Sequence, residues 1–301
     1  MSVRTSLAHV VLLPVLLLLQ PPPAWAAIEC FKKPFDKYGH VPNTDAGICA
    51  AAATINSFVY LRNTYPGIYG NTNIVPDWNK DGEIDEKDYV ESRDKIANGW
   101  TYGDKERKGI YSNPSGSDPK QPDQDWWLTK MYWFDDFAPG TTIFDGQVYG
   151  RPGATKWYKG DVLEDKYPEW SFLWKQIYSC EDVELGIYPK DGGVGHAITL
   201  TGLCWEDKDG DKSWDPGETP NKILYADPNQ RDWKAPMEGL VAVTGGRIEF
   251  KWWQDEKIWY IDHAWSESPI PEPASVTVWS VLAILGITVT WRQRTDRGCG
   301  S

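Results

Sequence analysis

The sequence contains little positive charge for its length. Its 301 residues include 31 Lys and Arg against 43 Asp and Glu, so the formal net charge is −12. Nucleic acids and anionic membrane surfaces repel a chain of this charge, whereas cations are attracted to it. We therefore expect no nucleic-acid partner, and we expect a chain that is suited to binding cations.

Long apolar runs are also scarce, and the two that occur lie at the ends of the chain. The first covers residues 10–19, follows Arg4 and precedes Ala24-Trp25-Ala26. A basic residue, an apolar stretch too short to span a bilayer and an Ala-x-Ala site are typical of a secretory signal peptide. Residues 1–26 are therefore predicted to direct export and to be removed; a first membrane anchor is the alternative.

The second apolar run covers residues 274–291, follows Pro271-Glu272-Pro273 and is itself followed by Arg292, Arg294 and Arg297. It is long enough to cross a bilayer, and basic residues beyond it favour a cytoplasmic tail. This end of the chain, residues 269–301, resembles the PEP-CTERM sorting signal of Gram-negative bacteria. The resemblance implies anchoring in the inner membrane and recognition by an exosortase-type sorting enzyme. The alternative is an ordinary C-terminal anchor.

Both end segments place residues 27–268 outside the cytoplasm, at the cell surface or in the extracellular space. This length suits one domain with a substantial core. An oxidising compartment permits disulfides. If Cys49 stays free, Cys30, Cys180 and Cys204 cannot all pair within this segment. We expect Cys180 to pair with Cys204, because the two would lie on neighbouring strands.

Residues 49–61 predict a buried helix that begins at a cysteine. Four alanines follow Cys49, and Ile55, Phe58 and Val59 fall on one apolar face. Cys49 would lie in the first turn, where free N–H groups and the helix dipole lower the pKa of a thiol. The alternative is a small buried cysteine that heads a core helix.

Residues 77–88 match the spacing of an EF-hand calcium loop. Oxygen-bearing side chains stand at loop positions 1, 3, 5, 9 and 12, with glycine at position 6 and Ile84 at position 8. The predicted ligands are Asp77, Asn79, Asp81, Asp85, Asp88 and the backbone carbonyl of Glu83. Position 12 is Asp rather than Glu, as in dockerin-like loops, and a helix is expected over residues 89–97. The alternative is an acidic, solvated turn.

A second acidic loop covers residues 207–218. Its glycine stands at position 4 instead of 6, and it resembles the D-x-D-G-D…D-P-G-E loops of secreted bacterial proteins. The predicted calcium ligands are Asp207, Asp209, Asp211, Ser213, Asp215 and Glu218. The loop joins strands expected at residues 194–203 and 222–226, so its ordering is expected to hold those strands in register.

The rest of the pattern predicts an α+β fold. A helix is expected over residues 167–177 and a helix or strand over 126–137. Further strands are expected within residues 141–157, 183–188 and 247–262. Residues 99–125 are rich in Gly, Pro, Ser, Lys and Asp and predict an exposed loop.

Three chemistry-bearing residues stand at the ends of these predicted elements. Cys49 begins a helix, His196 begins a strand, and Asp227 ends the next strand. In such a set the thiolate attacks a carbonyl, the histidine activates the thiol and protonates the leaving group, and the acid orients the imidazole ring. The alternative for His196 is a core histidine whose ring nitrogens are satisfied.

This order of residues resembles that of papain-like cysteine peptidases. The blocks Gly-Ile-Cys49-Ala-Ala-Ala, Gly195-His196-Ala-Ile-Thr-Leu and Tyr225-Ala-Asp227-Pro-Asn are similar to those of bacteriocin-leader-processing peptidases and of the streptococcal IgG-degrading cysteine peptidase. Those families usually have Gly after the cysteine, where this chain has Ala50. Papain-like enzymes usually place an oxyanion-hole Gln six residues before the cysteine. Here that position is Asn43, which can donate the same hydrogen bond with a shorter reach, and Lys37 is its rival.

The resemblance implies a papain-like fold for residues 27–268, in which the catalytic helix packs on an antiparallel sheet and the calcium loops are insertions. It implies a secreted or surface cysteine peptidase, or an acyl transferase of the same chemistry, acting on a peptide or protein through Cys49, His196, Asp227 and Asn43. The alternative is a non-catalytic, calcium-binding surface or matrix protein on the same fold.

Overall fold

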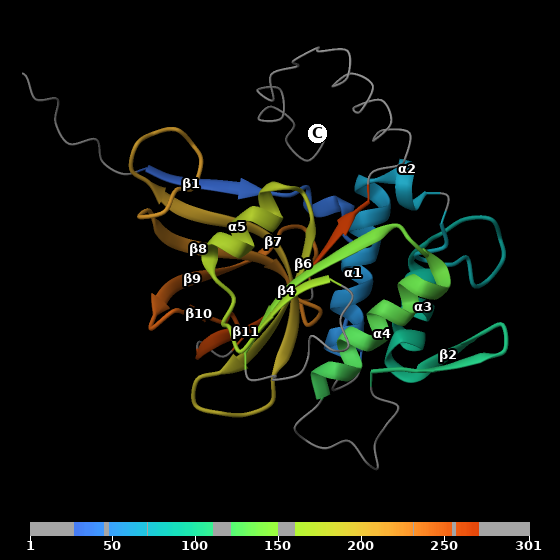
Figure 1. Ribbon diagram of the computed structural model, residues 1–301. Helices are drawn as coiled ribbons and strands as arrows, with labels where there is room; N and C mark the ends of the chain where they lie inside the picture. Colours follow the sequence, from blue (N-terminus) through green and yellow to red (C-terminus); the bar gives the residue numbers. More distant parts are fainter. Residues whose placement is uncertain are drawn as a thin grey trace, which may run out of the picture.

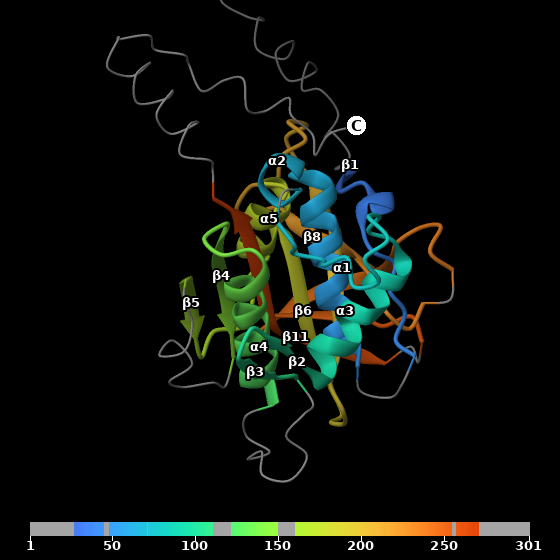
Figure 2. The same cartoon turned by 90° about the vertical axis from the view of Figure 1, so that its right-hand side faces the viewer.

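A large sheet forms the centre of the molecule, and most of the helices lie on one side of it (Figures 1 and 2). This computed structural model describes residues 27–44, 48–70, 72–110, 122–149, 160–230, 232–254 and 257–270. The predicted signal peptide and all but the first two residues of the predicted sorting signal lie outside these ranges. None of the helices in the described ranges has the length and apolar character needed to cross a membrane.

The helices follow from local signals in the sequence. In chain order they are η2 (Phe35–Lys37, a single 3-10 turn), α1 (Cys49–Thr64), α2 (Pro66–Tyr69), α3 (Glu86–Asn98), α4 (Pro122–Phe137) and α5 (Trp170–Tyr178). The predicted helix that begins at Cys49 is confirmed. Residues 126–137, expected as helix or strand, form the larger part of helix α4.

The strands of the main sheet are β1 (Ala27–Lys32), β4 (Thr142–Val148), β5 (Gly160–Glu164), β6 (Asp182–Pro189), β7 (His196–Asp207), β8 (Thr219–Ala226), β9 (Met237–Thr244), β10 (Arg247–Lys251) and β11 (Ile258–Pro269). They pair in the order β1-β7-β8-β9-β10-β11-β4-β5, and β6 pairs with both β7 and β11. Strands β6 to β11 therefore close into a ring. All described pairs of this sheet are antiparallel except β4 with β5.

The predicted α+β class is confirmed by this large, mostly antiparallel sheet and its few helices. One prediction is wrong in part: residues 99–125 were expected to be loop, but β2 (Gly99–Tyr102) and β3 (Lys105–Lys108) form a hairpin within them, and α4 begins at Pro122. The hairpin turns at Gly103, where the positive φ of 61° suits glycine. The charged residues of β3 hid the strand from a reading based on apolar alternation.

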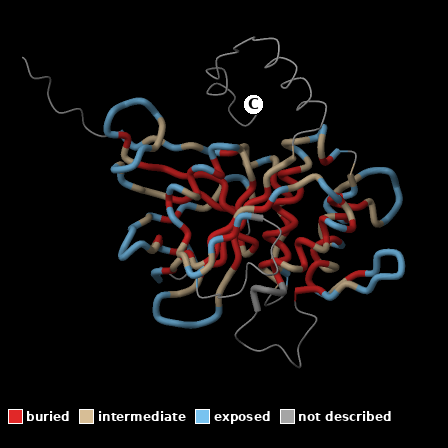
Figure 3. Tube along the Cα trace, in the orientation of Figure 1, coloured by how far each residue is buried: buried red, intermediate tan, exposed pale blue. Residues whose placement is uncertain are grey.

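Helix α1 occupies the centre of the larger apolar core, between the sheet and helices α3 and α4 (Figures 2 and 3). Every residue from Ala50 to Leu61 is buried, so the helix has no solvated face. The four alanines allow the sheet to approach closely, and the Thr199 hydroxyl of β7 donates a hydrogen bond to the Ala53 carbonyl at 3.1 Å. A second apolar core lies between α5 and the strands of the ring.

The disulfide prediction is wrong, because Cys204 pairs with Cys30 rather than with Cys180. Strand β1 runs antiparallel to β7, and the register places Cys30 directly opposite Cys204, with 4.1 Å between their Cα atoms. Residues 28–40 gave no strand pattern in the sequence, so this neighbour of β7 was missed. Cys180 instead follows α5, where its carbonyl accepts a hydrogen bond from the Tyr60 hydroxyl at 2.8 Å.

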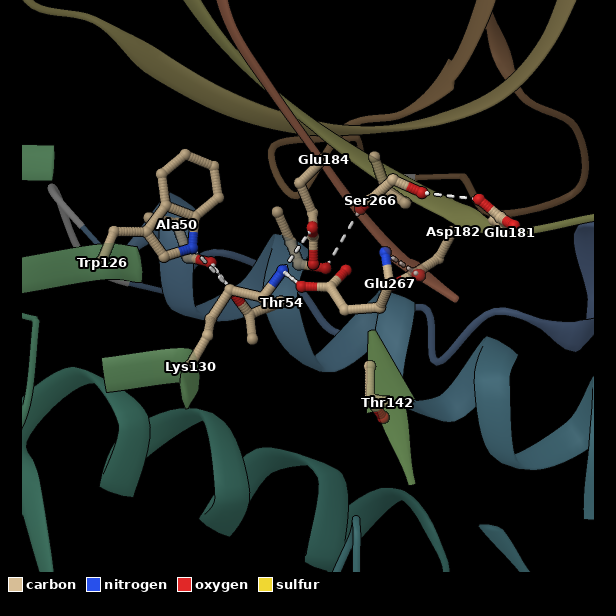
Figure 4. A network of polar contacts seen from close by, with 12 residues as sticks. Ala50, Thr54, Trp126, Lys130, Thr142, Glu181, Asp182, Glu184, Ser266 and Glu267 are labelled. Carbon is tan, nitrogen blue, oxygen red and sulfur yellow. Dashed lines mark hydrogen bonds and ion pairs between the residues drawn. The ribbon is translucent and has the colours of Figure 1, made fainter. Parts of the chain in front are cut away.

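A network of buried charged groups crosses the interface between α1, α4 and the sheet (Figure 4). The ammonium of Lys130 on α4 forms ion pairs with Glu184 of β6 and Glu267 of β11, and all three side chains are fully buried. The Glu267 amide donates to Asp182 at 3.1 Å. The core therefore holds three neighbouring carboxyl groups around one ammonium, and the buried Lys33 donates to the Glu181 carbonyl, while burial lowers the pKa of its amine to about 7.

Burial dominates the protonation of this network. It raises the pKa of Glu184 to about 8, with a further rise from the charge of Glu267. It also raises the pKa of Glu267 to about 8, helped by the charge of Asp182. Burial opposes the charged form of Lys130 as well, but the carboxylates of Glu184 and Glu267 outweigh it and raise the pKa of the ammonium. Lys130 thus stays charged, whereas Glu184 and Glu267 are largely protonated near neutral pH and become fully ionised only above about pH 8.

Replacement of Lys130 by methionine is expected to lower the free energy of unfolding at about pH 9 by about 3–5 kcal/mol, because it leaves buried, ionised carboxylates without their cation. Urea denaturation monitored by tryptophan fluorescence measures this value. The loss should shrink as the pH falls below about 8, since protons then neutralise Glu184 and Glu267.

Lys222→Met is the matched control for this experiment. Its ammonium pairs with Glu238 at 2.9 Å, but both side chains are partly exposed. A pair of this kind contributes at most about 1 kcal/mol. Equal losses in Lys130→Met and Lys222→Met would contradict a stabilising role for the buried network.

Candidate active site

Cys49 is the first residue of α1, and among the described residues it is the free cysteine. The N-cap residue, Ile48, has no side chain that can accept hydrogen bonds from the first-turn amides. Those amides are therefore available to stabilise negative charge at this end of the helix. The thiol is only partly exposed, since α1 is buried from the next residue onward.

His196 begins β7 and faces the start of α1. Its neighbour Gly195 must be glycine, because a Cβ there would lie 2.5 Å from the ring of Tyr188. The hydrogen bond from Thr199 to Ala53 fixes β7 against α1 one turn into the helix. His196 and Cys49 are near enough that each shifts the pKa of the other. The helix start and the strand start, 147 residues apart in sequence, thus meet at one point.

Asp227 comes directly after β8, and its side chain is fully buried. Its Oδ1 accepts hydrogen bonds from His196 Nε2 at 2.8 Å and from the Asn229 amide at 2.8 Å. Its Oδ2 accepts from the indole nitrogens of Trp252 at 2.9 Å and Trp253 at 2.7 Å. Because Nε2 of His196 is directed at Asp227, its Nδ1 is left to face the Cys49 thiol.

The three groups shift each other's protonation in a consistent way. Burial opposes the charged form of each group, but the partners outweigh it. Hydrogen bonds to Asp227 and Cys49, together with their charges, raise the pKa of His196 to about 9. The hydrogen bond and charge of His196, and the amides of Ala197 and Ala50, lower the pKa of Cys49. His196 likewise lowers the pKa of Asp227. The arrangement favours a thiolate beside an imidazolium near neutral pH.

Asn43 lies beside the loop that follows Asp227. Its backbone amide donates to the Pro228 carbonyl at 2.7 Å, and its side-chain amide donates to Asn229 Oδ1 at 3.0 Å. These contacts bring Asn43 to the acidic side of the site, and its role as an oxyanion donor stays a prediction. The rival residue Lys37 lies elsewhere: its carbonyl accepts from Asn63, which is about 21 Å along α1 from Cys49.

The first acidic loop, residues 77–88, is organised by its own amides. Gly82 has a φ of 90° and donates to Asp77 Oδ2 at 2.9 Å, as expected for the tight turn at loop position 6. Asp88, whose ligand role stays a prediction, accepts from the Trp78 and Asp85 amides, and with Asp85 it forms the capping box of α3. Asp77 Oδ1 is buried without a hydrogen-bond partner, so this part of the loop could accept a cation. Asn79 and Asp81 flank it, whereas the Glu83 amide donates to Asp81.

The second acidic loop, residues 207–218, gathers its carboxylates more closely. Oxygen atoms of Asp207, Asp209 and Asp211 lie within 4.8 Å of one another. The hydrogen bond from the Asp211 amide lowers the pKa of Asp209, but partial desolvation and the charges of Asp211, Glu218 and Asp207 raise it on balance. Like charges therefore repel one another here, which a bound cation would relieve. Glu218 accepts from the Lys208 and Asp215 amides, and Asp211 from the Ser213 amide.

The two loops differ in their relation to the site. The second loop lies at the far end of the β7–β8 hairpin, about 36 Å along β7 from His196, so its ordering affects the site only through the two strands. The first loop leads into α3, and Arg93 of α3 donates to the Pro42 carbonyl at 2.8 Å, next to Asn43. The first loop is thus the one with a short path of contacts to the site.

Sequence reasoning missed the two indoles that bind Asp227. Trp252 and Trp253 follow β10 and were assigned only to a region of strand. Two adjacent tryptophans after a strand were the available signal, but tryptophan is common in domain cores. Trp253 also lines a cavity of about 520 Å³, together with Asn229, Gln230, Asp232, Met237 and Gln254.

The comparisons with known proteins add no assignment. The chain matches no protein-family model, and it matches no curated protein.

The thiol of Cys49 is expected to be alkylated by iodoacetamide well below its unperturbed pKa of about 8.5, because His196 stabilises the thiolate. The rate is measured against pH under non-reducing conditions. In His196→Ala the rise in alkylation rate should shift to higher pH, where an ordinary buried thiol ionises.

His40→Ala serves as the control, since His40 bonds to the Phe35 carbonyl at 2.9 Å rather than to Cys49. Its alkylation profile should match that of the wild type. An ordinary thiol profile in the wild-type protein would rule out the thiolate–imidazolium pair.

Proposed function

We propose that this chain is a cysteine peptidase with a papain-like fold, or an acyl transferase of the same chemistry, acting on a peptide or protein. The observation that carries the proposal is the set Cys49, His196 and Asp227: His196 is hydrogen-bonded to Asp227, and His196 shifts the pKa of the Cys49 thiol at the start of a buried helix. A helix start, a strand start and a strand end supply the same three roles in papain-like enzymes. The antiparallel sheet packed on α1 supports the same fold assignment.

The proposed chemistry uses each group once in each half of the reaction. The Cys49 thiolate forms a bond to the carbonyl carbon, and the electron pair moves to the carbonyl oxygen. Collapse of this adduct breaks the carbon–nitrogen bond, while the imidazolium of His196 gives its proton to the leaving nitrogen. Neutral His196 then takes a proton from water, the hydroxide attacks the thioester, and the thiolate leaves. Asp227 orients the ring and stabilises the imidazolium.

The oxyanion of the adduct requires hydrogen-bond donors near Cys49. The backbone amide of Cys49 is one candidate, because it is a first-turn amide without an intrahelical partner. The side-chain amide of Asn43 is the other, provided that it leaves Asn229 when substrate binds. One of its two N–H groups is already free of that hydrogen bond.

A second proposal is that the chain binds calcium. The repulsion among Asp207, Asp209 and Asp211, and the buried unpartnered oxygen of Asp77, support it. When bound, calcium would supply neutralising charge and hold the loops. Asp207, Asp209 and Asp211 are the best-placed ligands, with Ser213, Asp215 and Glu218 nearby in the same loop. In the first loop Asp77, Asn79 and Asp81 fit, and Asp85 and Asp88 are engaged in capping α3.

The same acidic loops favour one alternative function, a non-catalytic calcium-binding protein of the cell surface or matrix on the same fold. Under either function we propose export through residues 1–26. We further propose anchoring in the inner membrane and sorting by an exosortase-type enzyme through residues 269–301.

Labelling by a peptide with a thiol-reactive electrophile separates the two functions. The wild-type protein should be labelled at Cys49 and Cys49→Ala should not. Turnover of a peptide library should fall by about 10²- to 10⁴-fold in His196→Ala, the usual contribution of a general acid and base. Absence of both labelling and turnover in a folded protein would favour the non-catalytic alternative.

Calcium is expected to raise the melting temperature by about 5–10 °C at a hundredfold excess over the dissociation constant. Asp209→Ala should remove most of the rise in melting temperature that comes from calcium at the second loop. Asp81→Ala should remove most of the rise that comes from calcium at the first loop. Asp104→Ala, in the exposed turn between β2 and β3, is the control and should respond like the wild type. A melting curve that changes with neither calcium nor a chelator would leave both loops as acidic turns.

A further inference from the structure

Two consecutive tryptophans share one oxygen of Asp227. In an extended strand, neighbouring side chains point to opposite faces, so they could not reach the same atom. Here β10 ends at Lys251, and the chain turns at once: the Trp252 amide donates to the Lys257 carbonyl at 3.1 Å. This turn directs both indole N–H groups at Asp227 Oδ2, at 2.9 Å and 2.7 Å.

The two indoles limit what the carboxylate can do. An indole N–H donates and never accepts, so with two of them at Oδ2 this oxygen has no room for a proton of its own. Oδ1 is occupied by His196 and by the Asn229 amide. Asp227 is therefore held as an anion, in the one rotamer that reaches His196.

The indoles also act on the proton of His196. The charged groups that face this ring are Cys49, from α1, and Asp227, after β8. The positive ends of the two N–H dipoles lie next to the carboxylate and weaken its attraction for the imidazolium. A general acid works best when its proton is not held too tightly.

We propose that Trp252 and Trp253 are positioning residues, which fix the Asp227 carboxylate toward His196 and limit how strongly it retains the proton that His196 gives to the leaving group. This inference rests on the proposed function for its catalytic consequence, but not for its effect on His196. The two residues act from different places. Trp252 is buried with its ring 5.2 Å from that of His196, whereas Trp253 is 37% exposed and lines the cavity beside Asn229.

The test replaces each tryptophan by phenylalanine, which keeps a ring and removes the donor. Titration of the labelled His196 imidazole by NMR should show a pKa above that of the wild type in Trp253→Phe and in Trp252→Phe. Peptide turnover near pH 7 should fall about tenfold in kcat, with little change in KM, because a hydrogen bond to a charged group is lost. The basic limb of the pH profile should move upward with the His196 titration.

Two control experiments distinguish a positioning role of Trp252 and Trp253 from a general loss of stability. Trp78→Phe removes an indole hydrogen bond to Ser92, 2.8 Å long and outside the site, and should leave the His196 titration unchanged. In an Asp227→Asn background, Trp253→Phe should cause no further change, since the charge that the indole weakens is gone.

The outcomes distinguish this proposal from the proposed function. A His196 titration that is unchanged in both Trp252→Phe and Trp253→Phe, or equally changed in Trp78→Phe, would overturn the positioning role. A shifted titration in a protein that cleaves no peptide would support the positioning role and reject the peptidase.

Discussion

The packing of a helix with no solvated face against the sheet is the constraint on which the candidate site depends. From Ala50 to Leu61 the helix α1 is buried on every side, so its position is fixed by its neighbours rather than by solvent. The alanines bring β7 close enough for Thr199 to bond to the Ala53 carbonyl. This contact between α1 and β7 places Cys49 opposite His196. Strand β8 pairs with β7, so Asp227, which follows β8, lies beside His196.

Charged groups lie at two places along the packed helix α1, and each set has partners that offset the cost of burial. Toward the middle of α1, Lys130 stands between Glu184 and Glu267, in a position that an apolar core would otherwise fill. At the start of α1, His196 stands between Cys49 and Asp227. Around Lys130, the ionisable groups join α4 to strands β6 and β11. Around His196, they favour the thiolate form of Cys49 beside a protonated imidazole.

Several features that depend on neighbouring residues were predicted correctly from the sequence, whereas several that depend on contacts between distant residues were missed. Helix α1 was predicted because its alanines and its apolar face are local signals. Strand β7 was predicted from the β-rich run of residues 194–203, and the order of Cys49, His196 and Asp227 gave the candidate site. Strand β1 and its disulfide were missed, because only pairing with a distant strand makes residues 27–32 extended. The capping box that Asp88 forms with Asp85 was not predicted from the acidic spacing of the loop.

The sequence alone determined the α+β class, the helix that begins at Cys49 and the chain order of the candidate residues Cys49, His196 and Asp227, because side-chain chemistry and local periodicity are properties of the sequence itself. The tertiary structure alone decided that Cys30 meets Cys204, that Lys130 lies among buried carboxylates, and that Trp252 and Trp253 converge on Asp227. Each of these joins residues whose proximity comes from closing the sheet and packing helices on it. Such proximity depends on the fold of the whole chain, so no local stretch of sequence encodes it.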